Sequence, residues 1–135
     1  MKNCFLIPLV ILCTVSLGRG AEFVHETPVL FTASADVDGD GDADAVIVDK
    51  VTGLVTIGVR QADGSLLFNQ PQNSGIPNVT GVAVGRLLST TQDTLALTSP
   101  LANRVQVVNA AAPDLLPYLT YYPIAGPRFV AALGS

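Results

Sequence analysis

The chain of 135 residues has no tryptophan, one histidine and two cysteines, and charged residues make up only 13% of it. Both cysteines, Cys4 and Cys13, lie near the amino terminus, so the rest of the chain has no disulfide and no thiol chemistry. The single histidine, His25, lies beside Glu22 and Glu26, and no His/Cys cluster with zinc-binding spacing accompanies it. These absences exclude a disulfide-stabilised scaffold and a zinc centre.

Basic residues are also scarce, with seven Lys and Arg against eleven Asp and Glu, for a formal net charge of −4. Nucleic-acid recognition depends on patches of Lys and Arg, so we expect no nucleic-acid partner. The sequence also lacks a G-x-S-x-G nucleophile elbow, a phosphate-binding glycine loop and a credible general base. We therefore expect that this chain is not an enzyme.

The longest apolar run lies at the amino terminus. Lys2 provides a positive start, residues 5–15 are almost wholly apolar, and Gly18 and Gly20 are small residues at the −3 and −1 positions of a cleavage site. The run is shorter than the roughly 20 residues that a spanning helix needs, and no other segment approaches that length. We predict a secretory signal peptide cleaved near Gly20, a secreted (extracellular or periplasmic) protein, and no membrane span.

After this segment, short runs rich in Val, Ile, Leu and Thr are separated by Gly, Pro, Asn and Asp. No long stretch has the 3.6-residue apolar period of an amphipathic helix. The pattern predicts an all-β fold with tight turns. The expected strands lie near 28–34, 45–49, 54–60, 65–70, 79–85, 94–98, 104–109, 117–122 and 128–133, with turns at 50–53 and 61–64 and connectors at 71–77 and 123–127.

The most informative motif is residues 36–44, Asp-Val-Asp-Gly-Asp-Gly-Asp-Ala-Asp, in which five of nine side chains are carboxylates. So many like charges repel one another unless a cation neutralises them. Calcium binds through several carboxylate and carbonyl oxygens on a tightly turned loop, and Gly39 and Gly41 supply the backbone freedom for such a turn. The motif predicts a calcium site, and a solvated acidic loop is the alternative.

The spacing of the acids narrows the kind of loop. A helix–loop–helix calcium hand needs Glu at its twelfth position, and the twelfth residue counted from Asp36 is Ile47. The motif is followed instead by Ala-Val-Ile-Val, a short β-branched segment typical of a strand buried on both faces. We therefore expect the loop to lead into a strand and not into a helix.

A D-x-D-G-D-G-x-x-D run that opens a β-strand resembles the FG-GAP/VCBS repeat, the blade unit of integrin-like β-propellers. The likeness continues through Gly58, Asp63-Gly64 and Phe68, whereas Val37 stands where the family usually has Phe. The resemblance implies antiparallel four-stranded blade-like repeats, bound Ca²⁺, and extracellular binding or adhesion with a protein or glycan partner. By this likeness calcium would be held by the side chains of Asp36, Asp38, Asp40 and Asp44 and by the backbone carbonyl of Asp42.

The strands fall into two sets that resemble one repeat written twice. Val82-Ala83-Val84-Gly85 recurs loosely as Ala131-Ala132-Leu133-Gly134, 49 residues later, and the same shift aligns Gly85 with Asp36 and Asp93 with Asp44. A period near fifty residues fits propeller blades, with chance similarity of Val/Ala-rich strands as the alternative. We expect a signal peptide at 1–20, a first repeat with the calcium loop at 21–77, a second, degenerate repeat without calcium at 78–127, and the start of a third at 128–135.

Two repeats and a strand cannot close a propeller, which needs about four to eight blades. A partial reading frame, an assembly of copies and an open two-sheet domain all remain open. Exposed strand edges favour association, so we expect self-association through open sheet edges. The leading functional hypothesis is a secreted calcium-binding β-repeat protein that acts as an extracellular binding or adhesion module without catalysis. The alternative is the N-terminal fragment of a larger secreted enzyme that carries such repeats.

Overall fold

The computed structural model describes residues 23–109, 120–123 and 125–128, and within these ranges every helix or strand element is a strand. The strands are β1 (Phe23–Glu26), β2 (Leu30–Ala35), β3 (Asp44–Asp49), β4 (Leu54–Arg60), β5 (Leu66–Phe68), β6 (Gln72–Asn73), β7 (Gly81–Gly85), β8 (Thr94–Ser99), β9 (Arg104–Val108) and β10 (Thr120–Pro123). The predicted all-β class is confirmed for these residues. None of them forms a helix long and apolar enough to cross a membrane.

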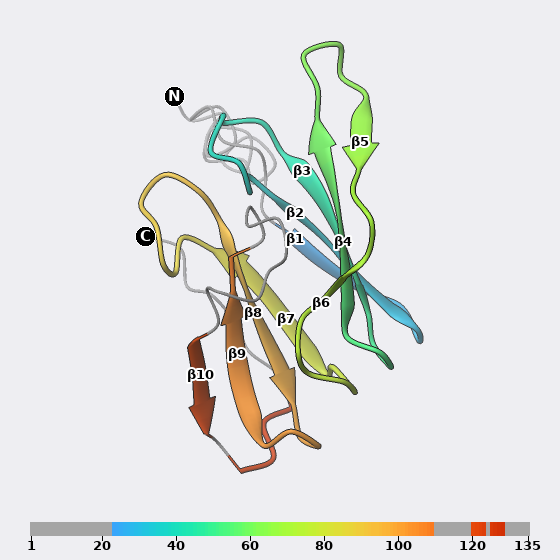
Figure 1. Cartoon of the computed structure of the whole chain (residues 1–135), viewed down its shortest axis with the longest axis vertical. Coiled ribbons are helices and arrows are strands. Elements are labelled where there is room, and N and C mark those ends of the chain that lie inside the picture. The colour runs from blue at the N-terminus through green and yellow to red at the C-terminus, as the bar shows by residue number, and fades with distance from the viewer. Residues whose placement is uncertain (1–22, 110–119, 124, 129–135) are drawn as a thin grey trace, which may run out of the picture.

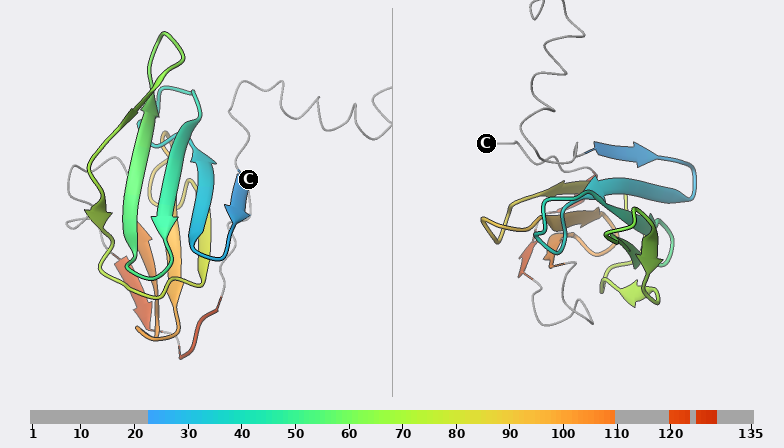
Figure 2. Two further views of the ribbon diagram at one scale, coloured as in Figure 1. Left: turned by 90° about the vertical axis from the view of Figure 1, so that its right-hand side faces the viewer. Right: turned by 90° about the horizontal axis from the view of Figure 1, so that it is seen from above.

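The strands form two open antiparallel sheets that lie face to face (Figures 1 and 2). The first sheet has the order β1-β2-β3-β4-β5, and β6 pairs with β4 beyond the end of β5. The second sheet has the order β10-β9-β8-β7. The second sheet therefore has four strands, as the second set of predicted strands does, whereas the first sheet has two more, β1 and β6, which the sequence pattern did not indicate.

A single core of buried side chains lies between the sheets. The first sheet contributes Phe31, Ala33, Ala35, Val46, Val48, Val55 and Ile57, and the second contributes Val82, Val84, Leu95, Leu97 and Val108. In β2 and β3 the burial alternates strictly between buried and half-buried positions. This alternation is expected of a strand that has one face in the core and one face toward solvent.

The two sheets correspond to each other after a shift of 50 residues. Ala35 pairs with Asp44 in the first sheet, and Gly85 pairs with Thr94 in the second. The 49-residue alignment expected from the sequence is therefore wrong by one position. The error matters because side chains of a strand alternate between faces, so a slip of one residue moves each of them to the opposite face.

With the correct shift, the sheets stack head to tail. The core-facing positions of the first sheet correspond to the far face of the second sheet, which includes the buried residues Ala83, Ala96 and Val107. Each sheet thus presents the opposite face to its neighbour, as successive units of a stack do. Conversely, the core residues Val82, Val84, Leu95 and Val108 correspond to Thr32, Ser34, Ala45 and Gly58 on the outer face of the first sheet. At these four positions the outer face carries smaller or more polar residues, whereas the core residue Leu97 corresponds to the equally large Ile47.

The connector between the sheets closes one end of the core. Ile76 and Val79 are only 1% and 2% exposed. The Val79 N–H donates to the carbonyl of Lys50 in the β3–β4 turn at 2.7 Å, and the side-chain amide of Gln106 in β9 donates to the carbonyl of Ser74. The segment expected to be a simple linker therefore packs and hydrogen-bonds to both sheets.

The predicted strands agree closely with the observed ones along most of the described chain, although β2 and β7 each begin two residues later than expected and β5 is shorter than the predicted 65–70. The predicted strand at 117–122 overlaps β10, and its first residues lie outside the described ranges. The predicted strand at 128–133 also lies outside them, apart from Arg128, which is not in a strand. The turn at 50–53 is present, and Gly53 ends it with a φ of 73°.

Candidate metal centre

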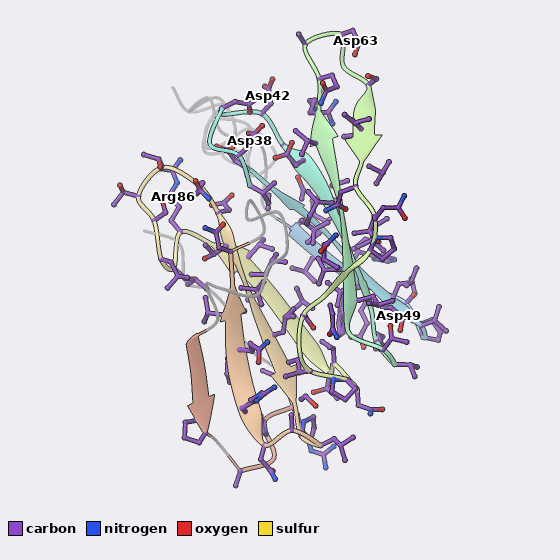
Figure 3. All side chains as sticks on the ribbon, in the orientation of Figure 1. Asp38, Asp42, Asp49, Asp63 and Arg86 are labelled. Carbon is purple, nitrogen blue, oxygen red and sulfur yellow. The ribbon has the colours of Figure 1, made fainter. Side chains whose placement is uncertain are left out.

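The acidic loop joins β2 to β3 at one end of the sheets, where Figure 3 labels Asp38 and Asp42. Gly39 and Gly41 have φ angles of 82° and 96°. Residues other than glycine rarely adopt such angles because their Cβ clashes with the backbone. These two glycines therefore make the turn that the sequence predicted, and the loop leads into the strand β3 as expected.

Three of the predicted ligands converge in this loop. Carboxylate oxygens of Asp36, Asp38 and Asp40 all lie within 4.8 Å of one another, with Asp36 buried and the other two exposed. Two oxygens bound to one calcium ion lie at most about 5 Å apart, since each Ca–O distance is about 2.3–2.6 Å. The three carboxylates therefore fit the spacing and the donor chemistry that calcium requires.

Backbone N–H groups of the loop hold these carboxylates in place. Asp36 accepts hydrogen bonds from Gly39 at 2.8 Å and from Gly41 at 3.2 Å. Asp38 accepts one from the N–H of Asp40 at 3.1 Å. These donors carry no net charge, so they orient the acids without removing the repulsion between them.

The electrostatic cost of the loop is visible at Asp38. Partial burial raises the pKa of this carboxyl above its ordinary value, and repulsion from Asp44 and Asp40 raises it further, against an opposing backbone hydrogen bond from Asp40. A raised pKa means that the environment of Asp38 disfavours the charged form of its carboxyl group. A cation bound between the carboxylates would reverse this penalty.

The other two predicted ligands are placed differently. Asp44 is 2% exposed, and its two carboxylate oxygens accept the N–H groups of Val37 at 3.0 Å and Arg60 at 2.8 Å. Its side chain thus fastens the loop to β4, although it lies close enough to Asp38 to raise the pKa of that residue. Asp42 is exposed and its carboxylate is outside the cluster of three. Coordination by the Asp44 side chain and by the Asp42 carbonyl remains a prediction.

Asp93 is a residue of this centre that the sequence reasoning misplaced. Its carboxylate accepts the N–H of Asp36 at 2.8 Å, and its own N–H donates to the Asp36 carbonyl at 2.7 Å. Asp93 is fully buried and precedes β8 of the second sheet. The sequence alignment matched it with Asp44, but the strand register makes it the counterpart of Ala43 in the first sheet. The only signal was that Asp93 is the single acid of its loop.

The corresponding loop of the second sheet, residues 86–93, has the same length and keeps none of the clustered carboxylates. Arg86 stands at the position of Asp36, and its guanidinium donates to the carbonyl of Thr90 at 2.7 Å. The Thr94 hydroxyl accepts the N–H of Leu87 at 3.2 Å, as Asp44 does for Val37 in the first loop. This turn therefore forms without the acids, which makes their concentration in the first loop informative.

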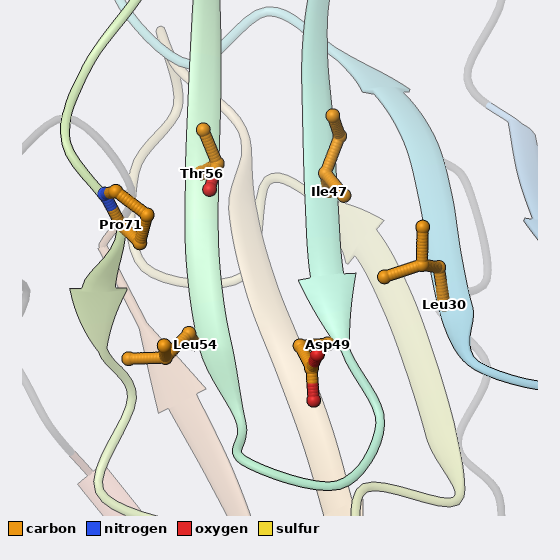
Figure 4. A pocket seen from close by; sticks show the side chains of 6 residues that line it. All are labelled: Leu30, Ile47, Asp49, Leu54, Thr56 and Pro71. Atoms are coloured by element: carbon orange, nitrogen blue, oxygen red, sulfur yellow. The ribbon is translucent and has the colours of Figure 1, made fainter.

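A shallow depression on the outer face of the first sheet is another candidate site (Figure 4). Its volume is about 200 Å³, and it is lined by Leu30, Ile47, Asp49, Leu54, Thr56 and Pro71. Ligand pockets usually measure about 300–1,000 Å³. Its one carboxylate, Asp49, accepts the N–H groups of Val51 and Thr52, which lower its pKa. The depression thus offers no pair of groups for acid–base chemistry.

Comparison of the chain with protein-family models, with curated proteins and with solved structures gives no match. Function is therefore inferred from the residues and their geometry. The acidic loop is the strongest candidate site in the described part of the chain because it combines clustered ligands, a glycine-dependent turn and an anchor from the second sheet.

Proposed function

We propose that the protein is a secreted calcium-binding β-repeat protein whose loop 36–44 holds one calcium ion at the end of two stacked sheets. One observation carries the proposal, namely the convergence of the Asp36, Asp38 and Asp40 carboxylates within 4.8 Å. A lone acidic loop gains nothing from such convergence, because like charges at this distance repel. A calcium ion would neutralise them.

The residues of the loop fit distinct parts of a calcium shell. The exposed carboxylates of Asp38 and Asp40 are accessible to an arriving ion. The buried Asp36 is fixed by hydrogen bonds with Gly39, Gly41 and Asp93. The side chain of Asp44 and the carbonyl of Asp42 would complete the set. Bound calcium would supply neutralisation and a cross-link within the loop.

The proposed role is extracellular binding or adhesion, with a protein or a glycan as the partner and no catalysis by this chain. The head-to-tail stacking of the two sheets supports a relation to blade-like repeats, in line with the FG-GAP/VCBS resemblance of the loop. The clustering of the acids in one loop supports a binding role, since paired catalytic carboxylates face each other across a cleft.

Isothermal titration calorimetry with calcium tests the proposal. We expect binding in the range of extracellular modules, with a Kd on the order of 0.1–1 mM. Changing Asp38→Asn with Asp40→Asn keeps the hydrogen-bond acceptors but removes two charges, and should weaken binding at least about tenfold (~1.4 kcal/mol). The matched control, Asp49→Asn with Asp63→Asn, removes the same charge from the end of β3 and from the β4–β5 turn, and it should bind as the unchanged protein does. Absence of calcium heat from the unchanged protein would overturn the proposal.

A further inference from the structure

The β4–β5 hairpin extends beyond the end of the two sheets (Figures 1 and 2). All residues from 61 to 71 are exposed. Within them, Leu66, Leu67 and Phe68 form strand β5 and are 37%, 66% and 48% exposed. Three consecutive exposed apolar residues are a liability in a soluble protein unless they serve an interaction.

Polar contacts hold this hairpin in one conformation. The carboxylate of Asp63 accepts both the N–H and the O–H of Ser65, at 2.9 and 2.6 Å. The guanidinium of Arg60 donates to the carbonyls of Ala43 at 2.9 Å and Gly64 at 3.2 Å. The exposed strand is therefore fixed before any partner arrives, which lowers the entropic cost of binding one.

The outer edge of β5 is available for pairing. The backbone bonds from Gln61 to Ser65 and from Asn69 to Ile57 show which residues face β4. Because an antiparallel ladder alternates, Leu67 bonds toward β4, while the N–H and C=O groups of Leu66 and Phe68 point outward. In the described part of the chain no strand pairs with this edge.

Natural proteins usually protect a strand edge with charges, proline or a bulge. Residues 65–70 contain no charged residue and no proline. The opposite edge of the sheet, β1, is different because it carries His25 and Glu26, and Glu26 forms an ion pair with Lys50 at 2.5 Å. Of these two edges, β5 is therefore the better suited to association.

We propose that β5 pairs antiparallel with β5 of a second copy of this chain, about a two-fold axis at Leu67. The segment Ser65-Leu66-Leu67-Phe68-Asn69 has the same order of polar and apolar residues in both directions. The two-fold axis therefore places Leu66 of one copy opposite Phe68 of the other, and Ser65 opposite Asn69. No charged residue then faces a like charge. The outward backbone groups of Leu66 and Phe68 then bond to each other across the axis.

This pairing joins two six-stranded sheets into one continuous sheet. It uses a short edge, so its area falls in the range of weak, transient contacts. The dimer should accordingly form in a concentration-dependent way. It requires no calcium ion and none of the carboxylates of the loop 36–44, so its test is separate from that of the proposed function.

Sedimentation equilibrium of the whole protein tests the proposal. We expect the average mass to rise from monomer toward dimer between tens of micromolar and millimolar concentration. The variant Leu67→Lys should stay monomeric, because it places two like charges opposite each other at the two-fold axis. Leu101→Lys is the matched control, since Leu101 is 69% exposed on the β8–β9 turn, and it should dimerise as the unchanged protein does. A monomer at all concentrations, or a dimer that survives Leu67→Lys, would overturn the proposal.

Two further variants test the pairing geometry. Across a non-hydrogen-bonded antiparallel pair the Cα atoms lie about 4.5 Å apart, within disulfide range. Leu67→Cys should therefore give an intermolecular disulfide under mild oxidation at a rate at least tenfold above Leu101→Cys. Leu66→Pro removes an outward N–H that the monomer does not use, and should also prevent dimerisation. Equal cross-linking of the two cysteine variants, or an unchanged dimer with Leu66→Pro, would show that strand pairing is not the contact.

Discussion

Two hydrogen bonds join Asp36, which follows β2, to Asp93, which precedes β8. The Asp36 N–H donates to the Asp93 carboxylate at 2.8 Å, and the Asp93 N–H donates to the Asp36 carbonyl at 2.7 Å. The same Asp36 directs its own carboxylate into the acidic cluster. One residue thus belongs both to the candidate metal site and to the contact between the sheets. We therefore expect that ordering of the loop 36–44 also stabilises the second sheet.

The first prediction concerns this contact. Asp93→Ala leaves the buried N–H of Asp36 without its acceptor, and an unmet buried donor costs about 1–3 kcal/mol. We expect urea unfolding without calcium to show a loss of that size. Asp42→Ala, at an exposed position of the same loop, is the control and should cost less than about 0.5 kcal/mol. Equal midpoints for the two variants would contradict a role for Asp93 in joining the sheets.

The second prediction concerns the stability gained from calcium. A ligand that binds only the folded state stabilises it by about 2.7 kcal/mol at a hundredfold excess over its Kd. We expect calcium to raise the melting temperature measured by calorimetry and a chelator to return it to the lower value. The variant with Asp38→Asn and Asp40→Asn should melt at one temperature in both conditions. A melting temperature of the unchanged protein that ignores the chelator would count against the site.

The third prediction concerns pH in the absence of calcium. The pKa of Asp38 is raised by burial and by its acidic neighbours, so its contribution to stability is fully present below the ordinary aspartate value of 3.8 and is lost as pH rises through the raised pKa. Asp38→Asn should therefore be more stable than the unchanged protein at neutral pH and equal to it in acid.

Asp63 provides a control of opposite sign for this titration. Hydrogen bonds from the hydroxyl and the N–H of Ser65 lower its pKa, so its contribution is present above the ordinary value and is lost as pH falls through the lowered pKa. Asp63→Asn should be less stable than the unchanged protein at neutral pH. Urea midpoints measured across the acid range decide between the signs, and a loss of stability with Asp38→Asn at neutral pH without calcium would refute the third prediction.

The fourth prediction concerns the turn beside the connector. A Cβ placed on Gly53 would lie 1.8 Å from the carbonyl oxygen of Ile76, and its φ is 73°. Gly64 has a similar φ of 86° with open space around it. Gly64→Ala should cost about 1–2 kcal/mol from backbone strain alone, whereas Gly53→Ala should cost at least about 2 kcal/mol more because the connector must move. Equal costs in urea unfolding would show that the connector is not packed as described.

Much of the fold could be predicted because short runs rich in Val, Ile, Leu and Thr, separated by Gly, Pro, Asn and Asp, mark strands and turns locally. The strands β1 and β6 could not be predicted in this way. All four residues of β1 are exposed, and β6 has only two residues, which pair with β4. The burial of Ile76 was also hidden, because a lone apolar residue between Gly75 and Pro77 has no periodicity to reveal it.

The acidic site was predictable in part for a different reason. The spacing of Asp36, Asp38 and Asp40 predicts that their carboxylates lie close together, because all three residues lie on one short turn. The place of Asp93 was not predictable, since it depends on the strand register, and a slip of one residue assigned it to the wrong position. Hydrogen bonds between segments 57 residues apart are set by packing and not by local sequence.

Anomalous diffraction from crystals grown in millimolar calcium tests the metal site most directly. We expect one peak between the carboxylates of Asp36, Asp38 and Asp40, with oxygens about 2.3–2.6 Å from the ion. The same peak should be absent from the loop 86–93, where Arg86 stands in the position of Asp36. Crystals soaked in calcium that show no peak at loop 36–44, or a peak at another place alone, would contradict calcium binding by this loop.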